Sequence, residues 1–148
     1  MIWKKKQDLS RFRKAHKRDY QTALEEIRSG HKDSHWMWYI FPQIHGLGKR
    51  ENSVFYAIKN LDEAKAFLAD SYLGGNLREI SSALLALSTD RPRDVFDKPD
   101  DRKLQSCMTL FALVSEDGSV FHKVLEKYFQ GEMDYKTLRI LRETGEIE

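Results

Sequence analysis

The residues best suited to chemistry lie in one short run, Ser34-His35-Trp36-Met37-Trp38-Tyr39-Ile40-Phe41-Pro42-Gln43. An imidazole such as that of His35 can act as a general base or donate a hydrogen bond to a bound anion. The indoles of Trp36 and Trp38 can stack on a planar ring, and the amide of Gln43 offers both a donor and an acceptor. The competing interpretation is structural, with a core histidine that bonds a backbone carbonyl and tryptophans that fill space. The run therefore predicts either the wall of a pocket or an anchor of the core.

A second group of reactive side chains follows Pro99, at the expected start of a helix. Asp100 and Lys103 are three residues apart and can meet on one face, with the hydroxyl of Ser106 one turn further on. An acid, an amine and a hydroxyl would then reach a common cleft. The alternative is an ordinary helix start with an exposed ion pair, which is worth only a few tenths of a kcal/mol. For Cys107, on the apolar side of this helix, the sequence favours a buried and unreactive thiol.

The candidate metal ligands are His31 and His35, which are four residues apart. Two such histidines can share a zinc ion only when both lie on one helix. Gly30 and a possible cap at Ser34 instead place His31 in a loop ahead of the helix. The sequence has no HExxH motif and no paired cysteines, so it predicts neither a metal site nor a cofactor.

Apolar residues recur at spacings of three and four along most of the chain, which indicates helices. We expect helices over residues 8–18 and 19–30 (one kinked helix is the alternative), 34–40, 53–58, 62–68, 76–87, 99–112, 119–131 and 134–141. The Gly74-Gly75 pair is expected to interrupt the chain before residue 76. No alternating run is long enough for a sheet. The prediction is a compact all-α domain of six to eight short helices over residues 1–148, irregular rather than an up-down bundle, with a loosely packed segment at residues 1–7.

The composition indicates a soluble cytoplasmic protein. The chain has 148 residues, 32% charged residues, one cysteine and a net charge of +2. It has no apolar run of the roughly 20 residues that would cross a bilayer, and no secretory signal is apparent. Residues 1–35 hold ten Lys or Arg against five Asp or Glu, a net charge of +5. This basic third keeps open a nucleic-acid-binding module as an alternative function.

Three blocks of residues make the chain resemble a known family. They are Ser34 to Gln43 followed by Gly46-Leu47-Gly48, Ser53 and Tyr56; then Asp100-Asp101, Lys103-Leu104, Ser106 and Met108-Thr109-Leu110-Phe111; and finally Tyr128-Phe129, Gly131, Asp134 and Thr137-Leu138. They resemble the bacterial family catalogued as domain of unknown function 1810, over about residues 8 to 141. Arg50 stands where that family usually shows a serine. The resemblance implies a mainly helical single domain without an established activity.

The family blocks contain more polar and special residues than packing requires. We therefore expect the first two blocks to meet and to line one cleft. The expected catalytic residues are His35, Lys103 and Asp101, and the expected ligand contacts are Trp36, Trp38, Gln43, Gly48, Ser106 and Thr109. An indole for stacking and a lysine near a helix N-terminus suit a small nucleotide-like molecule, with hydrolysis or group transfer as the reaction class. A protein-interaction domain remains a further alternative and predicts an exposed apolar patch instead of a cleft.

Overall fold

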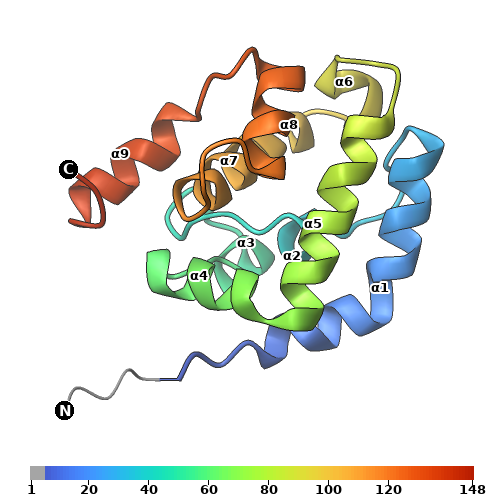
Figure 1. The fold of residues 1–148 in the computed structure, drawn as a ribbon. Coiled ribbons are helices and arrows are strands. Elements are labelled where there is room, and N and C mark those ends of the chain that lie inside the picture. Colours follow the sequence, from blue (N-terminus) through green and yellow to red (C-terminus); the bar gives the residue numbers. More distant parts are fainter. Residues whose placement is uncertain (1–5) are drawn as a thin grey trace.

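Within residues 6–148, the part of the chain that the computed structural model describes, the regular elements are all helices, joined by loops (Figure 1). The helices are α1 (Ser10–Ser29), α2 (Met37–Ile40), α3 (Glu51–Phe55), α4 (Leu61–Ala69), α5 (Ser71–Ala86), α6 (Pro92–Val95), α7 (Asp100–Leu113), α8 (Val120–Phe129) and α9 (Tyr135–Glu143). The prediction of an irregular all-α domain is confirmed. These residues hold nine helices, because α6 forms within residues 88–98, a stretch for which no helix is predicted. Residues 1–5 of the predicted loose N-terminal segment lie outside the described residues.

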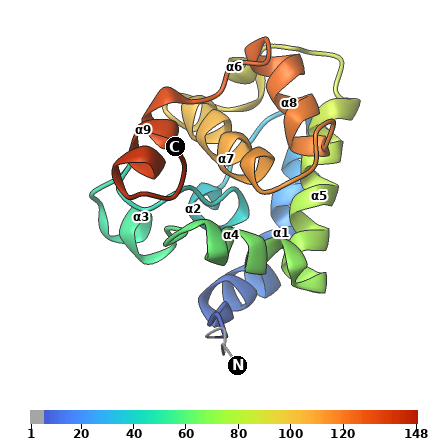
Figure 2. The same ribbon diagram turned by 60° about the vertical axis from the view of Figure 1, so that its left-hand side comes forward.

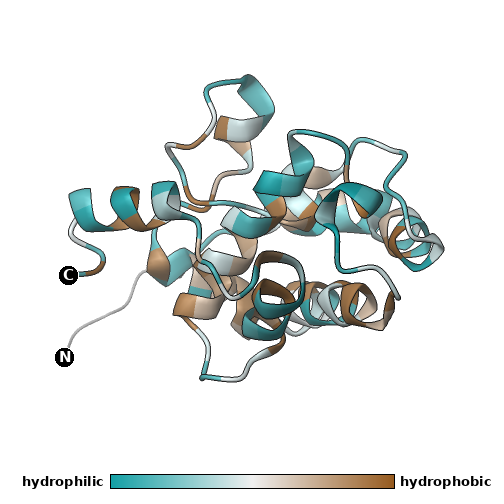
Figure 3. Ribbon diagram, turned by 90° about the horizontal axis from the view of Figure 1, so that it is seen from above, coloured by the Kyte–Doolittle hydropathy of each residue, from teal (hydrophilic) through white to brown (hydrophobic). Residues whose placement is uncertain are grey.

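Two long helices hold the others together. Helix α5 packs against α1, α4 and α8, and α7 packs against α4, α6, α8 and α9 (Figures 1 and 2). Along α9, at the end of the molecule that carries the C-terminus, hydrophobic and hydrophilic residues alternate (Figure 3). None of the helices described is both long enough and apolar enough to cross a membrane.

A chain of buried aromatic rings runs through the core and ties four helices to one another. The ring centroids of Phe12 on α1 and Phe67 on α4 are 5.1 Å apart, those of Phe67 and Phe111 on α7 are 5.5 Å apart, and those of Phe111 and Phe121 on α8 are 5.8 Å apart. All four rings are buried. Burying one phenylalanine side chain stabilises a fold by about 2–3 kcal/mol, so these contacts fix how α7 sits against the N-terminal half.

Three of the local helix signals are confirmed, at Gly30, Ser119 and Asp134, whereas α3 and α4 begin two residues or one residue before the expected starts at Ser53 and Asp62. Gly30 ends α1 in the left-handed conformation, with φ at 95°. Ser119 and Asp134 accept hydrogen bonds from the first turns of α8 and α9, as expected of N-cap residues. The ranges 8–18 and 19–30 form one helix, α1 (Ser10–Ser29), and Asp19 lies inside it. The helix starts after Leu9, while the Asp8 side chain accepts a hydrogen bond from the Ser10 amide.

The expected break at Gly74-Gly75 is wrong, because both glycines lie within α5. Asp70 caps this helix by accepting hydrogen bonds from the amides of Tyr72 and Leu73, so α5 starts before the glycines. Gly74 is buried and faces the end of α4. A Cβ at this position would lie 2.1 Å from the carbonyl oxygen of Leu68, far inside van der Waals contact. The glycine thus serves close packing of two helices rather than a turn.

The two glycines should therefore respond in opposite directions to alanine. Gly74→Ala is expected to lower the free energy of unfolding by about 2–3 kcal/mol, since the methyl group must push α4 and α5 apart. Gly75→Ala, whose Cβ would meet nothing within 4 Å, should raise it by about 1 kcal/mol through helix propensity. Urea denaturation of both variants measures the difference. Equal effects of the two substitutions would show that the Leu68 contact does not limit the packing.

Candidate functional site

The run from Ser34 to Gln43 is held in place by one carboxylate from α1. Glu26 Oε1 accepts hydrogen bonds from the backbone amides of Asp33 and Ser34 at 2.8 Å each, and from the indole Nε1 of Trp36 at 2.9 Å. Glu26 Oε2 accepts the Ser34 hydroxyl at 2.5 Å. Partial burial alone would raise the pKa of Glu26, but the bonds from Ser34, Trp36 and Asp33 outweigh it and lower the pKa to about 2. Glu26 is thus an ionised anchor for the loop before α2.

These bonds correct two expectations about the run. Ser34 does not cap α2, because its hydroxyl is committed to Glu26 and the helix begins after Trp36. Trp36 cannot stack on a ligand, because it is only 1% exposed and packs near the rings of Phe41 and Phe96. For this indole the structural interpretation holds, and its one polar atom is satisfied by Glu26.

The histidine that bonds a backbone carbonyl in the core is His16, not His35. His16 lies on the buried face of α1, with Nε2 at 2.8 Å from the carbonyl oxygen of Tyr39 and Nδ1 at 3.1 Å from the side-chain amide of Asn76. Assigned from these partners, Nε2 donates and Nδ1 accepts, which is the neutral tautomer. Burial lowers the pKa of His16 to about 4, although the bond to Tyr39 opposes the shift. His35 is exposed to solvent.

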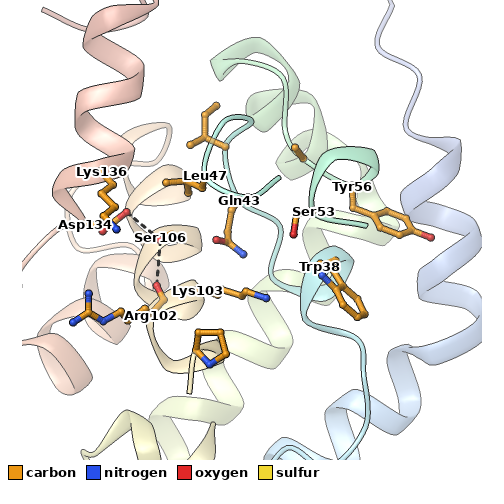
Figure 4. A pocket seen from close by; sticks show the side chains of 14 residues that line it. Trp38, Gln43, Leu47, Ser53, Tyr56, Arg102, Lys103, Ser106, Asp134 and Lys136 are labelled. Carbon is orange, nitrogen blue, oxygen red and sulfur yellow. Dashed lines mark hydrogen bonds between the residues drawn. The ribbon is translucent and has the colours of Figure 1, made fainter. Parts of the chain in front are cut away.

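A cavity of about 230 Å³ lies between the first family block and α7 (Figure 4). Its lining comes from the segment around α2 and α3 on one side and from α7 and the start of α9 on the other. The lining residues are Trp38, Gln43, Ile44, Leu47, Gly48, Ser53, Tyr56, Ala57, Pro99, Arg102, Lys103, Ser106, Asp134 and Lys136. Segments about 60 residues apart in the sequence therefore share one hollow, as the hypothesis of two meeting blocks required.

Lys103 joins the two sides of this cavity. Its ammonium nitrogen lies 5.8 Å from the ring centroid of Trp38, and Figure 4 shows the side chain extending from α7 towards that indole. The same nitrogen is 3.6 Å from the carboxylate of Asp100. Asp100 also pairs with Lys32 at 2.9 Å, and the Lys32 ammonium in turn lies 5.1 Å from the ring of Trp36. One carboxylate is thus shared by two lysines, each of which faces an indole.

The acid that contacts Lys103 is consequently Asp100 and not Asp101. The two neighbours lie on different sides of α7. The carboxylate of Asp101 faces Arg93, with its Oδ2 3.4 Å from Arg93 Nε, and Asp101 does not line the cavity. Its Oδ1 is buried and has no hydrogen-bond partner among the described residues.

The α7–α9 side of the cavity is fixed by an aspartate network. The Ser106 hydroxyl is 3.0 Å from Asp134 Oδ2 and 3.2 Å from the carbonyl oxygen of Arg102. The same Oδ2 accepts the amide and the hydroxyl of Thr137 at 3.1 and 2.6 Å. Thr109 is fully buried below it, donating to the Gln105 carbonyl and accepting the Asp134 amide. Thr109 therefore supports the start of α9 and does not face the cavity.

The opposite wall is a loop closed at its base. The Ile58 amide donates to the carbonyl of Gln43, and the His45 amide donates to the carbonyl of Ile58, both at 2.8 Å. Between these bonds the chain makes an excursion that includes α3. Within it, a Cβ on Gly48 would lie 2.6 Å from the Cβ of Ser53, so this position requires glycine for close packing. We call residues 46–55 the flap.

The structure brings together some of the expected site residues and separates others. Trp38, Gln43, Gly48, Lys103 and Ser106 line the cavity, whereas His35, Trp36, Asp101 and Thr109 do not. The polar and charged lining side chains that sequence reasoning did not assign are Ser53, Tyr56, Arg102, Asp134 and Lys136. Ser53, Tyr56 and Asp134 already belonged to the family blocks, which was the available signal. The sequence carries no signal that assigns Arg102 or Lys136 to the site.

The two alternative functions, a nucleic-acid-binding module and a protein-interaction domain, differ in their support. Much of the basic charge in residues 6–35 is spent within the protein, since Arg11 pairs with Glu63, Arg13 with Asp70, Arg18 with Asp19 and Lys32 with Asp100. This pairing weakens the case for a nucleic-acid-binding face. An exposed apolar spot does exist on the outer side of the flap, formed by Val54 and Phe55.

No group of three metal-ligating side chains gathers among residues 6–148. His31, one of the two histidines considered for zinc, is instead placed between Asp33 and Asp97. Its Nδ1 lies 2.9 Å from the first carboxylate and its Nε2 lies 3.3 Å from the second. These bonds raise the pKa of His31.

Residues 6–148 form an all-α domain with a cavity between two blocks that are distant in the sequence. Residues 6–141 match the family model described as "Protein of unknown function (DUF1810)", so the chain belongs to the DUF1810 family. A solved structure, the conserved hypothetical protein Rv1873 from Mycobacterium tuberculosis, is similar to it with a TM-score of 0.88 and 39% sequence identity, over 91% of this chain and 96% of that one. No curated protein matches the chain.

Proposed function

We propose that the protein binds a small nucleotide-like ligand in the cavity between the first family block and α7. The observation that carries the proposal is the pairing of Trp38 with Lys103, a stacking surface and a cation brought together from the two blocks. Stacking on an aromatic side chain is worth about 1–3 kcal/mol per base, and a nearby cation favours an anionic group on the same ligand. We place this ligand, and the protein, in the cytoplasm.

Polar groups that the fold does not use support a ligand at this place. The side-chain amide of Gln43 and the hydroxyl of Ser53 both line the cavity, and neither makes a hydrogen bond to another of the residues 6–148. In Figure 4 the Gln43 amide points into the space beside Lys103. An amide presents a donor and an acceptor together, which is the pattern that the edge of a nucleobase requires. The chemistry proposed for such a ligand is hydrolysis or group transfer, and it is tested by following the release of phosphate or free base from candidate nucleotides.

Substitutions at the cavity should separate binding from folding. Trp38→Ala is expected to weaken the binding of a responsive nucleotide on the order of tenfold to a hundredfold, because the stacking surface is lost. Trp38→Phe should keep most of the affinity. Lys103→Gln should lower the affinity about tenfold for a ligand whose anionic group contacts Lys103. A thermal-shift screen of nucleotides identifies the responsive ligand, since a molecule that prefers the folded state raises the melting temperature, and calorimetry then gives the affinities.

His35→Ala is the matched control for these variants, because His35 belongs to the same run but lies outside the cavity lining. It should bind as the wild type does. Trp38→Phe, Lys103→Gln and His35→Ala should melt close to the wild type without ligand, whereas Trp38→Ala also loses packing against the core and should melt lower. If His35→Ala loses binding while Trp38→Ala keeps it, the ligand does not occupy this cavity. If no nucleotide shifts the melting temperature of the wild-type protein, the proposal fails as a whole.

A further inference from the structure

The cavity carries more positive charge than its own carboxylates neutralise. Arg102, Lys103 and Lys136 line it, against one acid, Asp134. The Asp134 carboxylate is already engaged, since its Oδ2 accepts bonds from the hydroxyls of Ser106 and Thr137 and from the Thr137 amide. At neutral pH the lining thus has a surplus of about two positive charges, since lysine and arginine are protonated and aspartate is ionised.

This surplus is only partly compensated by a neighbour outside the lining, Asp100. Asp100 pairs more closely with Lys32, at 2.9 Å, than with Lys103, at 3.6 Å, so it cannot neutralise both lysines. Arg102 and Lys136 form no ion pair with any of the residues 6–148. Other cations of this fold do have partners, as Arg11 and Arg13 show on α1.

The charged and aromatic side chains occupy different ends of the cavity. Figure 4 shows Arg102 and Lys136 on the side of α7 and α9, together with Asp134, and the Arg102 guanidinium points outwards, away from Gln43. Trp38 and Tyr56 lie across the space on the side of α2 and α3. Lys103 extends between the two ends. A ligand that satisfies both ends must therefore carry a planar ring at one end and an anion at the other.

From these observations we infer that the ligand is a phosphomonoester of a ring compound the size of a nucleoside 5′-monophosphate, with its phosphate held by Arg102 and Lys136. This inference rests on the proposed function and specifies it. A phosphomonoester carries a charge of about −1.5 to −2 at pH 7, which matches the surplus of the lining. A guanidinium can bind two phosphate oxygens at once, and an ammonium adds a mobile point charge.

The size of the cavity points to one phosphate and one ring system. Its volume of about 230 Å³ falls below the range of about 300–1,000 Å³ typical of pockets for drug-sized molecules. A dinucleotide would exceed it. Because Arg102 and Lys136 are exposed, the phosphate end is open to water, and its affinity should fall as salt rises.

The test compares nucleosides with their own 5′-monophosphates by calorimetry, using adenosine, guanosine, cytidine and uridine and AMP, GMP, CMP and UMP. At least one monophosphate is expected to bind about tenfold more tightly than its nucleoside, as two cations meet the phosphate. Arg102→Gln and Lys136→Gln should each weaken that monophosphate about five- to tenfold and leave the affinity of the nucleoside unchanged. The matched control is Arg139→Gln on α9, whose side chain pairs with Glu143 and does not line the cavity. It should leave both affinities unchanged.

The outcomes distinguish this inference from the proposed function. Three results would overturn the phosphate site and still leave a nucleoside-binding cavity. These are equal affinities for nucleoside and monophosphate, tighter binding of a triphosphate, and equal effects of Arg102→Gln and Arg139→Gln. If no nucleoside or nucleotide binds, the proposed function fails. Inorganic phosphate then tests whether the phosphate site exists by itself. It should raise the melting temperature of the wild type and of Arg139→Gln but not of Arg102→Gln, and equal shifts in all three would overturn the site.

Discussion

Replacing Glu26 with alanine is expected to lower the free energy of unfolding by about 3 kcal/mol. The substitution removes the acceptor of the bonds from Asp33, Ser34 and Trp36. The loss is large because the indole Nε1 belongs to a side chain that is 1% exposed, and a buried donor left without a partner costs its desolvation energy. The segment that leads to Trp38 is released as well, so ligand binding should weaken together with stability.

Two neighbouring variants give this experiment its controls. Glu25→Ala removes an exposed carboxylate of the same helix and should change the free energy of unfolding by less than about 0.5 kcal/mol. Glu26→Gln keeps an oxygen at the same position and should cost less than Glu26→Ala. Urea denaturation measures all three, and near-ultraviolet circular dichroism follows the indole environment. Similar losses for Glu25→Ala and Glu26→Ala would refute the anchoring role.

The free energy of unfolding should fall by about 3 kcal/mol as the pH drops from 6.5 to 4. His16 is neutral in the fold, with a pKa of about 4, whereas an unfolded histidine titrates near 6.5. Between these values the unfolded chain takes up a proton that the folded chain cannot accept, so acidification favours unfolding by up to 1.36 kcal/mol per pH unit. Above pH 6.5 both states are neutral and the effect vanishes.

Other groups act in different pH windows. The pKa of Glu26 is lowered to about 2, so its contribution is present above its ordinary pKa of 4.5 and is lost below it. The raised pKa of His31 gives a contribution that is complete below pH 6.5 and declines above. The slope between pH 6.5 and 4.5 therefore reports His16. In His16→Gln, which can still donate to the Tyr39 carbonyl, this slope should largely disappear. An unchanged slope in this variant would assign the effect to another group.

Local signals predicted much of the helical framework. Gly30, Ser119 and Asp134 act through bonds to residues within four positions of themselves, so their roles can be inferred from the sequence. Gly74 was misinterpreted because its requirement comes from the carbonyl of Leu68, on another helix. A constraint imposed by packing between helices leaves no periodic pattern in the sequence.

The site was predicted less completely for the same physical reason. Trp36 and Trp38 are chemically alike, and it is the bond to Glu26 and the packing near Phe41 and Phe96 that enclose Trp36. Asp100 and Asp101 are adjacent acids that α7 turns towards different partners. Lys136 joins the cavity only because α9 packs against α7. Each distinction depends on tertiary contacts, whereas the meeting of the two blocks was inferred from their shared excess of polar residues.

The flap has two faces with different surroundings. Leu47, Gly48 and Ser53 form part of the cavity wall, while Val54 and Phe55 point outwards, Phe55 with 56% of its surface exposed. No side chain of α3 is buried, so this helix contributes no residue to the hydrophobic core. The Arg11 guanidinium donates hydrogen bonds to the carbonyl oxygens of Phe55, the last residue of α3, and of Ala57. Because one short segment forms both part of the cavity wall and the exposed apolar spot, any displacement of the flap changes both surfaces together.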